Sequence, residues 1–149
     1  MNEKTIKSYL MRYINAENKH IRIYEAYCAI IETIAGLGGY SYGLRVQATA
    51  SNSAKFERLI ERREAVFEKL IKAGVEAAEI KADLIIKINA LENARDKWIL
   101  TEKYVNRVPW NDLFNHGERS ERTYYEWHRA ALMAFGEIWE EAINASGRQ

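Results

Sequence analysis

The 149-residue chain contains a single proline, Pro109, and this scarcity constrains the fold more than any other feature. Proline lacks a backbone donor and clashes with the preceding turn, so it is tolerated at the start of a helix and not in its interior. Elsewhere apolar residues recur at three- and four-residue spacing, which is typical of amphipathic helices. We therefore predict an all-α protein in which one helix ends and another begins at Pro109.

Two apolar stripes at helical spacing occupy the first 92 residues. The first stripe covers residues 2–35, and the glycine-rich stretch that follows is predicted to end that helix. Residues 36–53, rich in glycine and serine, are predicted to form a loop. The second stripe continues through Gly74, which favours one long helix over two shorter ones.

Each of these two predicted helices has a single apolar face. The helices most simply bury those faces against each other as an antiparallel helical hairpin over residues 1–92, a unit for dimerisation or docking. Alternatively the faces pair between two chains, since a four-helix dimer core hides more apolar surface than one hairpin can.

The remaining residues, 93–149, predict shorter helices. One is expected to begin near Asn93. Another starts after Pro109, and its Trp110, Leu113 and Phe114 lie at i, i+3 and i+4, so they share one face.

A polar turn and a longer helix follow. Residues 115–119 contain no apolar side chain, and Gly117 permits the positive φ that a tight turn often needs. Ser120 is a candidate N-cap, with Glu121 in the first turn, where negative charge suits the helix dipole. Beyond it an apolar stripe runs to Ile138 and Trp139. The opposite face carries Arg122, Tyr125, Glu126 and Arg129. Two helices joined by a short glycine-containing turn, the second exposing guanidinium groups near its N-terminus, indicate a DNA-binding helix-turn-helix.

These residues also resemble a family of transcription proteins. The resemblance rests on the order of Tyr104-Val105, Trp110, Leu113-Phe114, Ser120, Thr123-Tyr124, Arg129-Ala130 and Leu132. The order is similar to region 4 of sigma-70 factors, which reads promoter −35 elements. It is more similar to small phage and prophage transcriptional regulators of the ArpU and RinA type, which have a serine and a threonine at the distance that Ser120 and Thr123 keep from Trp110.

The resemblance implies a sequence-specific transcriptional regulator of phage origin, with a sigma-region-4-like helix-turn-helix over residues 93–149. The sequence departs from the pattern of that family at three places. The turn His116-Gly117-Glu118-Arg119 replaces an apolar-Gly-apolar turn, with the glycine one position earlier. Phe114 stands where those regulators have a small residue, and Tyr124 stands where they have valine.

In this interpretation the helix that begins at Glu121 enters the major groove. Arg122 and Arg129 are the expected base or phosphate readers, because arginine pairs bidentately with guanine edges, and Glu126 accepts from cytosine. Phosphate contacts are expected from the turn and from the segment before Pro109. The predicted DNA-binding residues are Arg107, Arg119, Glu121, Arg122, Tyr125, Glu126 and Arg129.

The charge of the chain argues against strong DNA binding by one copy. The net charge is +1, and residues 94–132 carry seven Lys or Arg against six Asp or Glu. This balance gives few phosphate contacts and little counterion release. We therefore expect double-stranded DNA to be bound by a homodimer, or with RNA polymerase as a partner that already holds the DNA.

No catalytic constellation is visible, so we expect a protein that is not an enzyme and that has no cofactor and no metal site. The three histidines are far apart and lie outside HExxH or CxxC contexts. His128 falls on an apolar helix face and is predicted to be a buried, hydrogen-bonded core residue. The alternative function is a non-enzymatic helical adaptor whose C-terminal module binds protein, for example RNA polymerase, instead of DNA.

Cysteine content and hydropathy set the expected compartment. The single cysteine, Cys28, cannot form an intrachain disulfide, which is consistent with a reducing cytoplasm. No apolar run approaches the roughly 20 residues that span a membrane. We expect a cytoplasmic protein without a membrane partner.

Overall fold

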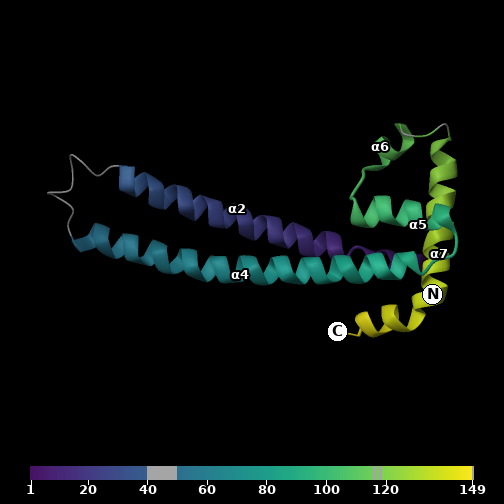
Figure 1. Cartoon of the computed structure of the whole chain (residues 1–149), viewed down its shortest axis with the longest axis horizontal. Helices are drawn as coiled ribbons and strands as arrows, with labels where there is room; N and C mark the ends of the chain where they lie inside the picture. Colours follow the sequence, from purple (N-terminus) through teal and green to yellow (C-terminus); the bar gives the residue numbers. More distant parts are fainter. Residues whose placement is uncertain (40–49, 116, 118, 149) are drawn as a thin grey trace. The chain divides into compact units, whose positions relative to one another are not determined.

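The computed structural model describes residues 1–39, 50–115, 117 and 119–148, and every regular element within these ranges is a helix (Figure 1). The elements are α1 (Glu3–Leu10), α2 (Arg12–Gly39), α4 (Ala50–Asn89), α5 (Ala94–Leu100), the π-helix η2 (Thr101–Val105), α6 (Trp110–Asn115) and α7 (Glu121–Ser146). The all-α prediction is confirmed. None of the helices in the described ranges is long and apolar enough to cross a membrane.

Two helices begin where the sequence offers a capping side chain. The amide oxygen of Asn2 accepts from the backbone N–H of Lys4 at 3.2 Å, at the start of α1. The amide oxygen of Asn93 accepts from the N–H of Arg95 at 2.9 Å, at the start of α5. These bonds satisfy amide groups that have no partner inside their own helix. The predicted helix start near Asn93 is confirmed.

The prediction of one helix over residues 2–35 is wrong at two points. A turn at Met11 (φ −71°, ψ −8°) separates α1 from α2, although the N–H of Met11 still donates to the carbonyl of Lys7 at 2.9 Å. The helix then continues through Gly36 to Gly39, because glycine lowers helix propensity without by itself ending a helix. Of the predicted loop 36–53, residues 36–39 and 50–53 are helical, and residues 40–49 lie outside the described residues.

The prediction of one long helix through Gly74 is confirmed by α4. A Cβ atom at Gly74 would lie only 3.1 Å from Nε2 of His20. Glycine at position 74 therefore leaves space for the imidazole ring of His20 from α2.

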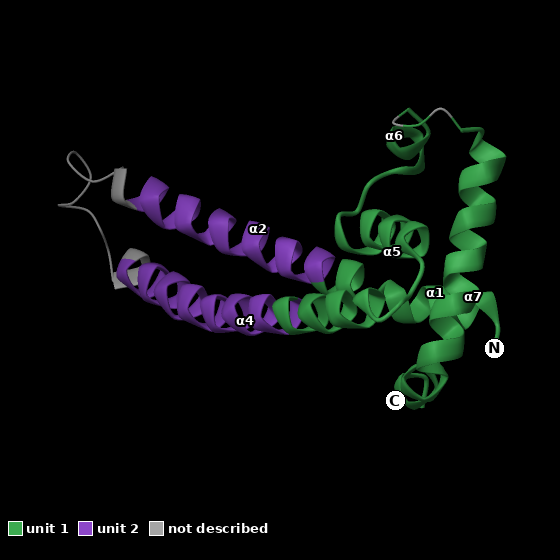
Figure 2. Ribbon diagram, turned by 45° about the vertical axis from the view of Figure 1, so that its right-hand side comes forward, with its two compact units in different colours: residues 1–16, 78–149 green, residues 17–77 purple. Residues whose placement is uncertain are grey.

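The chain divides into two compact units (Figure 2). Unit 1 consists of residues 1–16 and 78–149, and unit 2 consists of residues 17–77. The predicted division lay at residue 92. It differs from the observed one because the end of α4 packs with α1 and α7: the Trp139 Nε1 donates to the carbonyl of Lys87 at 3.1 Å, and the Lys87 Nζ donates to the Tyr9 hydroxyl.

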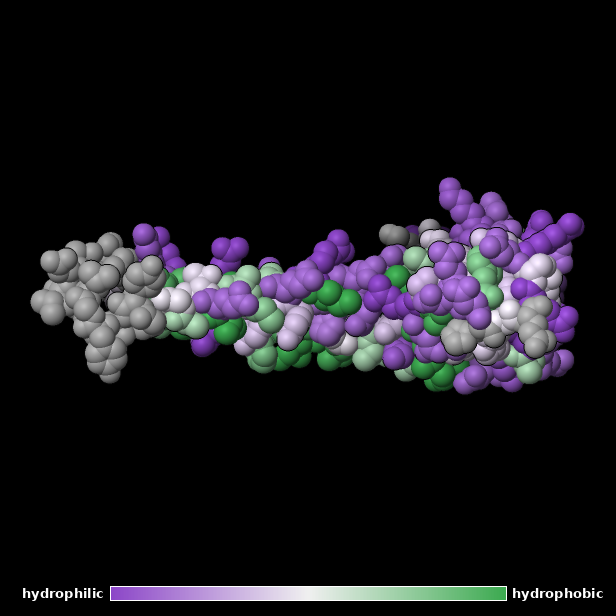
Figure 3. All heavy atoms as spheres, turned by 90° about the horizontal axis from the view of Figure 1, so that it is seen from above, coloured by the Kyte–Doolittle hydropathy of each residue, from purple (hydrophilic) through white to green (hydrophobic). Residues whose placement is uncertain are grey.

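Unit 2 is a pair of antiparallel helical segments from α2 and α4. The rings of Tyr27 and Phe67 lie 5.6 Å apart, and His20 lies next to Gly74. Residue numbers therefore rise along α4 as they fall along α2, so the two segments are antiparallel. Among the described residues of this unit only Ala73 and Ala77 are fully buried apolar residues. Figure 3 shows hydrophobic residues on the surface of this unit. Its exposed larger apolar side chains are Ile21, Tyr24, Ile31, Leu37, Phe56, Phe67, Ile71 and Val75.

Unit 1 has a core in which α1 and α5 pack against α7. The rings of Tyr9 and Phe135 lie 6.1 Å apart across the α1–α7 contact. A Cβ atom at Gly136 would lie 2.5 Å from Cδ1 of Ile6, so a side chain here would force Ile6 to move at this close helix crossing. The core also contains the buried side chains of Leu10, Leu84, Ile88, Ile99, Leu100, Leu113, Leu132 and Ile143.

The predicted buried stripe of α7 stops one turn early. The backbone of Trp139 is not helical (φ −112°, ψ 22°), and α7 bends there. Ile138, predicted to be buried, is 49% exposed because the bend ends the straight stripe that the spacing had assumed.

Candidate nucleic-acid interface

The start of α6 is set by Pro109. Its carbonyl oxygen accepts from the N–H groups of Asp112 at 3.1 Å and Leu113 at 3.2 Å, so the proline stands at the first turn of the helix as predicted. Leu113 is buried beneath α6. The rings of Trp110 and Phe114 stack at 5.8 Å on the same face.

The start of α7 is set by Ser120. Its hydroxyl oxygen accepts from the N–H of Thr123 at 3.3 Å and lies 2.9 Å from the Thr123 hydroxyl. The predicted N-cap is therefore confirmed. Two residues of the predicted turn, His116 and Glu118, lie outside the described residues.

Gly117 serves a different purpose from the one predicted. Among the described glycines none has a positive φ, so Gly117 does not supply a left-handed turn. Instead, a Cβ atom at this position would overlap the hydroxyl group of Tyr124. Glycine is needed here for space, because the tyrosine side chain fills the place of a side chain in the turn.

Aromatic rings join α6 to α7. Phe114 and Tyr124, which both depart from the pattern of the resembling family, have their rings 5.8 Å apart. Tyr125 lies 4.7 Å from the ring of Trp110 and 5.5 Å from that of Phe114. The larger side chains thus pack against each other across the two helices, at the separations where aromatic pairs attract.

The exposed side of α7 carries four of the predicted DNA-binding residues. All four side chains point outward, and we call them the α7 outer face: Arg122, Tyr125, Glu126 and Arg129. Arg122 is 89% exposed, and its Nε donates to Oε1 of Glu126 at 3.0 Å. Glu121, in the first turn, is exposed as well. The predicted exposure of this face is observed, with an ion pair on it that joins two of the predicted readers.

Arg129 is shared between the outer face and α1. Its Nε lies 3.7 Å from Oε2 of Glu3, and Oε1 of the same glutamate lies 2.7 Å from Nζ of Lys7. The hydrogen bond and charge of Lys7 hold the pKa of the Glu3 carboxyl below its usual range. Arg129 therefore faces a carboxylate that stays ionised near neutral pH.

Arg119 lies apart from the outer face. Its guanidinium carbon is 6.0 Å from the centre of the Trp127 ring, and the guanidinium carbon of Arg95 is 5.3 Å from the same ring. Tyr125 and Trp127 are two residues apart on a helix, which places them on nearly opposite sides. Arg95 was not selected from the sequence, because nothing in its spacing connects α5 to Trp127.

Arg107 and Tyr125 come together at a hollow of about 520 Å³ that we call the cationic groove. The groove is lined by residues from α1, α2, η2, α6, α7 and the segment before α6: Lys7, Met11, Ile14, Lys103, Tyr104, Arg107, Val108, Pro109, Trp110, Tyr125 and His128. Arg107 is also the one described non-glycine residue with a positive φ, 59°. Lys7 and Lys103 were missed by sequence reasoning, since only the packing of α1 and η2 brings them here.

Lys103 is held on the wall of the groove. Its Nζ donates to the carbonyl oxygen of Val108 at 2.9 Å and lies 4.5 Å from the centre of the Trp110 ring. Burial lowers the pKa of Lys103. The ammonium group is thus partly desolvated, and the partners named here are a neutral carbonyl and the face of an indole ring.

His128 forms the floor of the groove. Its Nε2 lies 2.8 Å from the Tyr104 hydroxyl in a buried contact. Burial, with the positive charges of Lys7 and Lys103, lowers the pKa of His128 to about 4. Burial also raises the pKa of the Tyr104 hydroxyl. At pH 7 the neutral imidazole can accept the hydroxyl proton, and the prediction of a buried, hydrogen-bonded histidine is confirmed.

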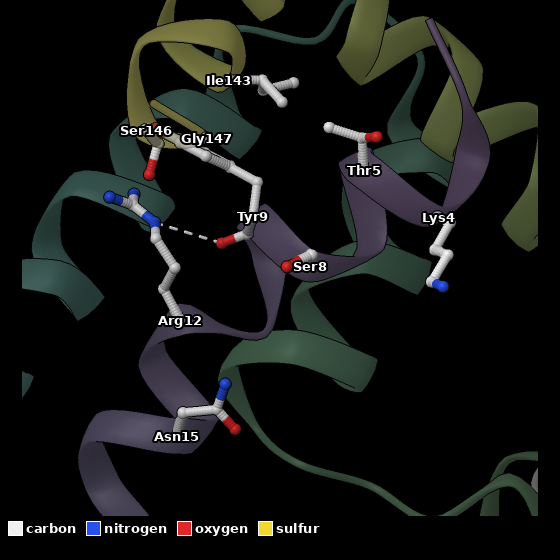
Figure 4. A pocket seen from close by; sticks show the side chains of 9 residues that line it. All are labelled: Lys4, Thr5, Ser8, Tyr9, Arg12, Asn15, Ile143, Ser146 and Gly147. Atoms are coloured by element: carbon white, nitrogen blue, oxygen red, sulfur yellow. Dashed lines mark hydrogen bonds between the residues drawn. The ribbon is translucent and has the colours of Figure 1, made fainter. Parts of the chain in front are cut away.

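A second hollow, of about 480 Å³, lies between α1, the start of α2 and the end of α7 (Figure 4). In it the Nε of Arg12 donates to the carbonyl of Tyr9 at 3.1 Å. The same guanidinium group lies 3.9 Å from the centre of the Tyr9 ring and 3.2 Å from Oδ2 of Asp83. Arg12 therefore links Tyr9 of α1 to Asp83 of α4. Because its guanidinium group already has these partners, this hollow is less suited to a ligand than the cationic groove.

The model of a family described as "Protein of unknown function (DUF1492)" matches residues 55–136, more than half of the chain. The matched segment includes most of α4, all of α5, η2 and α6, and α7 as far as Gly136. No curated protein and no solved structure matches the chain. In the described ranges, no three or more His, Cys, Asp or Glu residues are grouped so that they could hold a metal ion.

Proposed function

We propose that this chain, which belongs to the DUF1492 family of proteins of unknown function, is a sequence-specific DNA-binding transcriptional regulator. The observation that carries the proposal is the α7 outer face, which begins two residues after the capping Ser120 and presents Arg122, Tyr125 and Glu126 in the first two turns. Recognition helices of helix-turn-helix proteins contact base edges with residues of their N-terminal turns. The resemblance to sigma region 4 and to phage regulators supports the same function and a phage origin.

In this mechanism α7 enters the major groove with Arg122 as its principal reader. The exposed pair of Arg122 and Glu126 is worth about 0.3–0.5 kcal/mol, as is typical of such i, i+4 pairs. A bidentate contact between arginine and guanine is worth about 1–3 kcal/mol of discrimination. The internal pair is therefore weak enough to open when Arg122 contacts a guanine edge, and its opening frees Glu126 to accept from cytosine.

Phosphate contacts would come from both sides of the inserted helix. Arg107 adjoins Tyr125 at the cationic groove, whereas Arg119 adjoins Trp127 on the other side of α7. Two strands border a major groove, so cations on opposite sides of the helix can each contact one backbone. Arg95, which contacts the same Trp127 ring as Arg119, adds a third basic side chain to these phosphate contacts.

The proposed regulator acts as a homodimer that pairs through unit 2. In that unit Phe67, Ile71 and Val75 follow one another at four-residue spacing and remain exposed. A second copy would cover this apolar stripe and bring two outer faces to the DNA. Two linked sites bind far more tightly than one, which compensates for a net charge of only +1.

A protein-binding adaptor is the second candidate function, and one observation favours it. Both arginines of the outer face lie close to carboxylates of the same chain, Arg122 to Glu126 and Arg129 to Glu3. Such internal pairing lowers the positive potential that would attract DNA. In this alternative the outer face binds another protein, for example RNA polymerase.

Fluorescence anisotropy with labelled duplexes at low salt separates the two functions. We expect a duplex selected from a random library to bind the wild type, and Arg122→Ala/Arg129→Ala to bind it at least tenfold more weakly. The matched control is Arg58→Ala/Arg62→Ala, which removes the same charge from exposed positions of unit 2 and should bind like the wild type. Equal binding by all three proteins would refute the proposed recognition helix, and capture of RNA polymerase by a chain that selects no duplex would favour the adaptor.

A further inference from the structure

We propose that the cationic groove is a binding site for a small aromatic anion of the nucleoside monophosphate class. The inference does not require DNA binding, because the groove lies within unit 1, although Arg107 and Tyr125 belong both to the groove and to the proposed DNA contacts. Its volume, about 520 Å³, falls within the range of about 300–1,000 Å³ that is usual for small-molecule sites.

The charge of the lining selects an anion. Three cationic side chains contribute to the groove, Lys7, Lys103 and Arg107, and none of the described residues that line it is a carboxylate. Glu3, outside the lining, pairs with one of these cations: its Oε1 lies 2.7 Å from Nζ of Lys7. A phosphate group in the groove would supply the partly desolvated ammonium of Lys103 with a charged acceptor.

The aromatic side chains select a planar ring. Trp110 and Tyr125 lie 4.7 Å apart, and Tyr125 is 48% exposed, so part of its ring is accessible to a ligand. The neighbouring lining is apolar and comes from Met11, Ile14 and Pro109. A planar heterocycle can stack on such rings, and the stacking does not depend on which hydrogen-bonding groups the heterocycle carries at its edge. A nucleoside monophosphate carries both groups, a planar base and an anionic phosphate, joined by a sugar.

Two uncommon backbone features border the same groove. Lys103 and Tyr104 lie in the π-helix η2, and π-helical turns are frequent at functional sites. Arg107 has a left-handed backbone, which costs energy for any residue other than glycine and is also concentrated at ligand sites.

The segment that carries Arg107 is fixed by hydrogen bonds. The N–H of Asn106 donates to the carbonyl of Thr101 at 2.9 Å, and the N–H of Val108 donates to that of Glu102 at 2.9 Å. The Lys103 Nζ holds the Val108 carbonyl from the other side. The strained backbone is therefore part of a rigid turn that presents Arg107 and Lys103 together.

Isothermal titration of the full chain, without DNA, tests the inference. The probes are adenosine and guanosine monophosphates, adenosine alone, and inorganic phosphate. We expect saturable binding of at least one nucleotide with Kd below about 1 mM. Adenosine and phosphate should each bind at least tenfold more weakly, because each lacks one of the two recognised groups. Binding of none of the probes, or of phosphate as tightly as the nucleotides, would overturn the inference.

Variants locate the site and distinguish it from a contact to DNA. Lys103→Gln/Arg107→Gln should lower nucleotide affinity at least tenfold, whereas Lys19→Gln/Arg22→Gln, at exposed positions of unit 2, should leave it unchanged. Circular dichroism checks that each variant is folded. If a variant fails to fold, the titration of the wild type with the four probes still decides the inference. If the groove variant loses affinity for duplex DNA while the wild type binds no nucleotide, the groove is a backbone phosphate contact and the inference fails, although the proposed function stands.

Discussion

Units 1 and 2 are both built from amphipathic helices, but the apolar side chains of these helices are much more completely buried in unit 1 than in unit 2. In unit 1, side chains such as Leu10, Leu132 and Phe135 are fully enclosed by helices from distant parts of the chain. In unit 2 the fully buried apolar residues of the described part are two alanines, and the large side chains remain half-exposed. Two helices cannot enclose a large side chain between them, whereas a third crossing helix can. Unit 1 thus has an enclosed apolar core, whereas unit 2 keeps most of its large apolar side chains at its surface.

The largest expected effect is that of a core truncation in unit 1. Phe135→Ala should lower the free energy of unfolding by about 3–5 kcal/mol, because it removes a fully enclosed ring and leaves a cavity. Phe67→Ala in unit 2 should lower it by about 1 kcal/mol in dilute protein, since that ring is already 44% exposed. Urea denaturation measures both values. Equal losses would contradict the contrast between core and surface.

Acid should weaken unit 1 through His128. The pKa of His128 is lowered to about 4 in the folded protein, against 6.5 for a free side chain. Between these values the unfolded chain binds a proton that the folded chain does not, so stability falls as the pH falls from 6.5 to 4. The full loss is about 3 kcal/mol, from about 1.4 kcal/mol per pH unit. Hydrogen exchange should show it in unit 1, and His128→Gln should remove it. A wild-type stability that is constant over this range would contradict the buried neutral imidazole.

Glycine substitutions compare the packing of the two regions directly. Gly136→Ala should destabilise the protein by about 1–3 kcal/mol, because the new Cβ atom meets Ile6 across the α1–α7 crossing. Combining it with Ile6→Val should recover part of the loss, which a purely local helix effect would not allow. Thermal unfolding of the two single variants and the double variant provides the test.

The smallest effect, of opposite sign, is expected in unit 2. Gly36 lies in α2, and a Cβ atom added there would meet nothing within 4 Å, so Gly36→Ala should raise the free energy of unfolding by about 0.5–1 kcal/mol. The same chemical change thus stabilises an exposed helix and destabilises a packed one. Urea denaturation measures the difference, and a loss of stability at Gly36 would indicate that the surface of unit 2 is covered in solution.

Local features of the fold could be predicted from the sequence. The cap at Ser120, the helix start at Pro109 and the continuous helix through Gly74 depend on backbone chemistry within a few residues. The outward direction of Arg122 and Tyr125 follows from helical spacing. These predictions needed no knowledge of tertiary contacts.

Features that depend on distant packing could not be predicted. The π-helical turn places Lys103 and Tyr104 differently from an α-helical continuation, so spacing alone could not bring Lys103 to Trp110. The association of Lys7 with the cationic groove requires α1 to pack against α7. The role of Gly117 became visible only with the hydroxyl of Tyr124 beside it.

Selection of duplexes from a random-sequence library tests the central claim, that the α7 outer face reads DNA sequence. We expect the wild type to enrich a defined motif. We expect Arg122→Ala still to bind through phosphate contacts but to lose discrimination at one base pair, by a factor that corresponds to about 1–3 kcal/mol. Enrichment of no motif by the wild type, or the same motif with undiminished discrimination by Arg122→Ala, would contradict it.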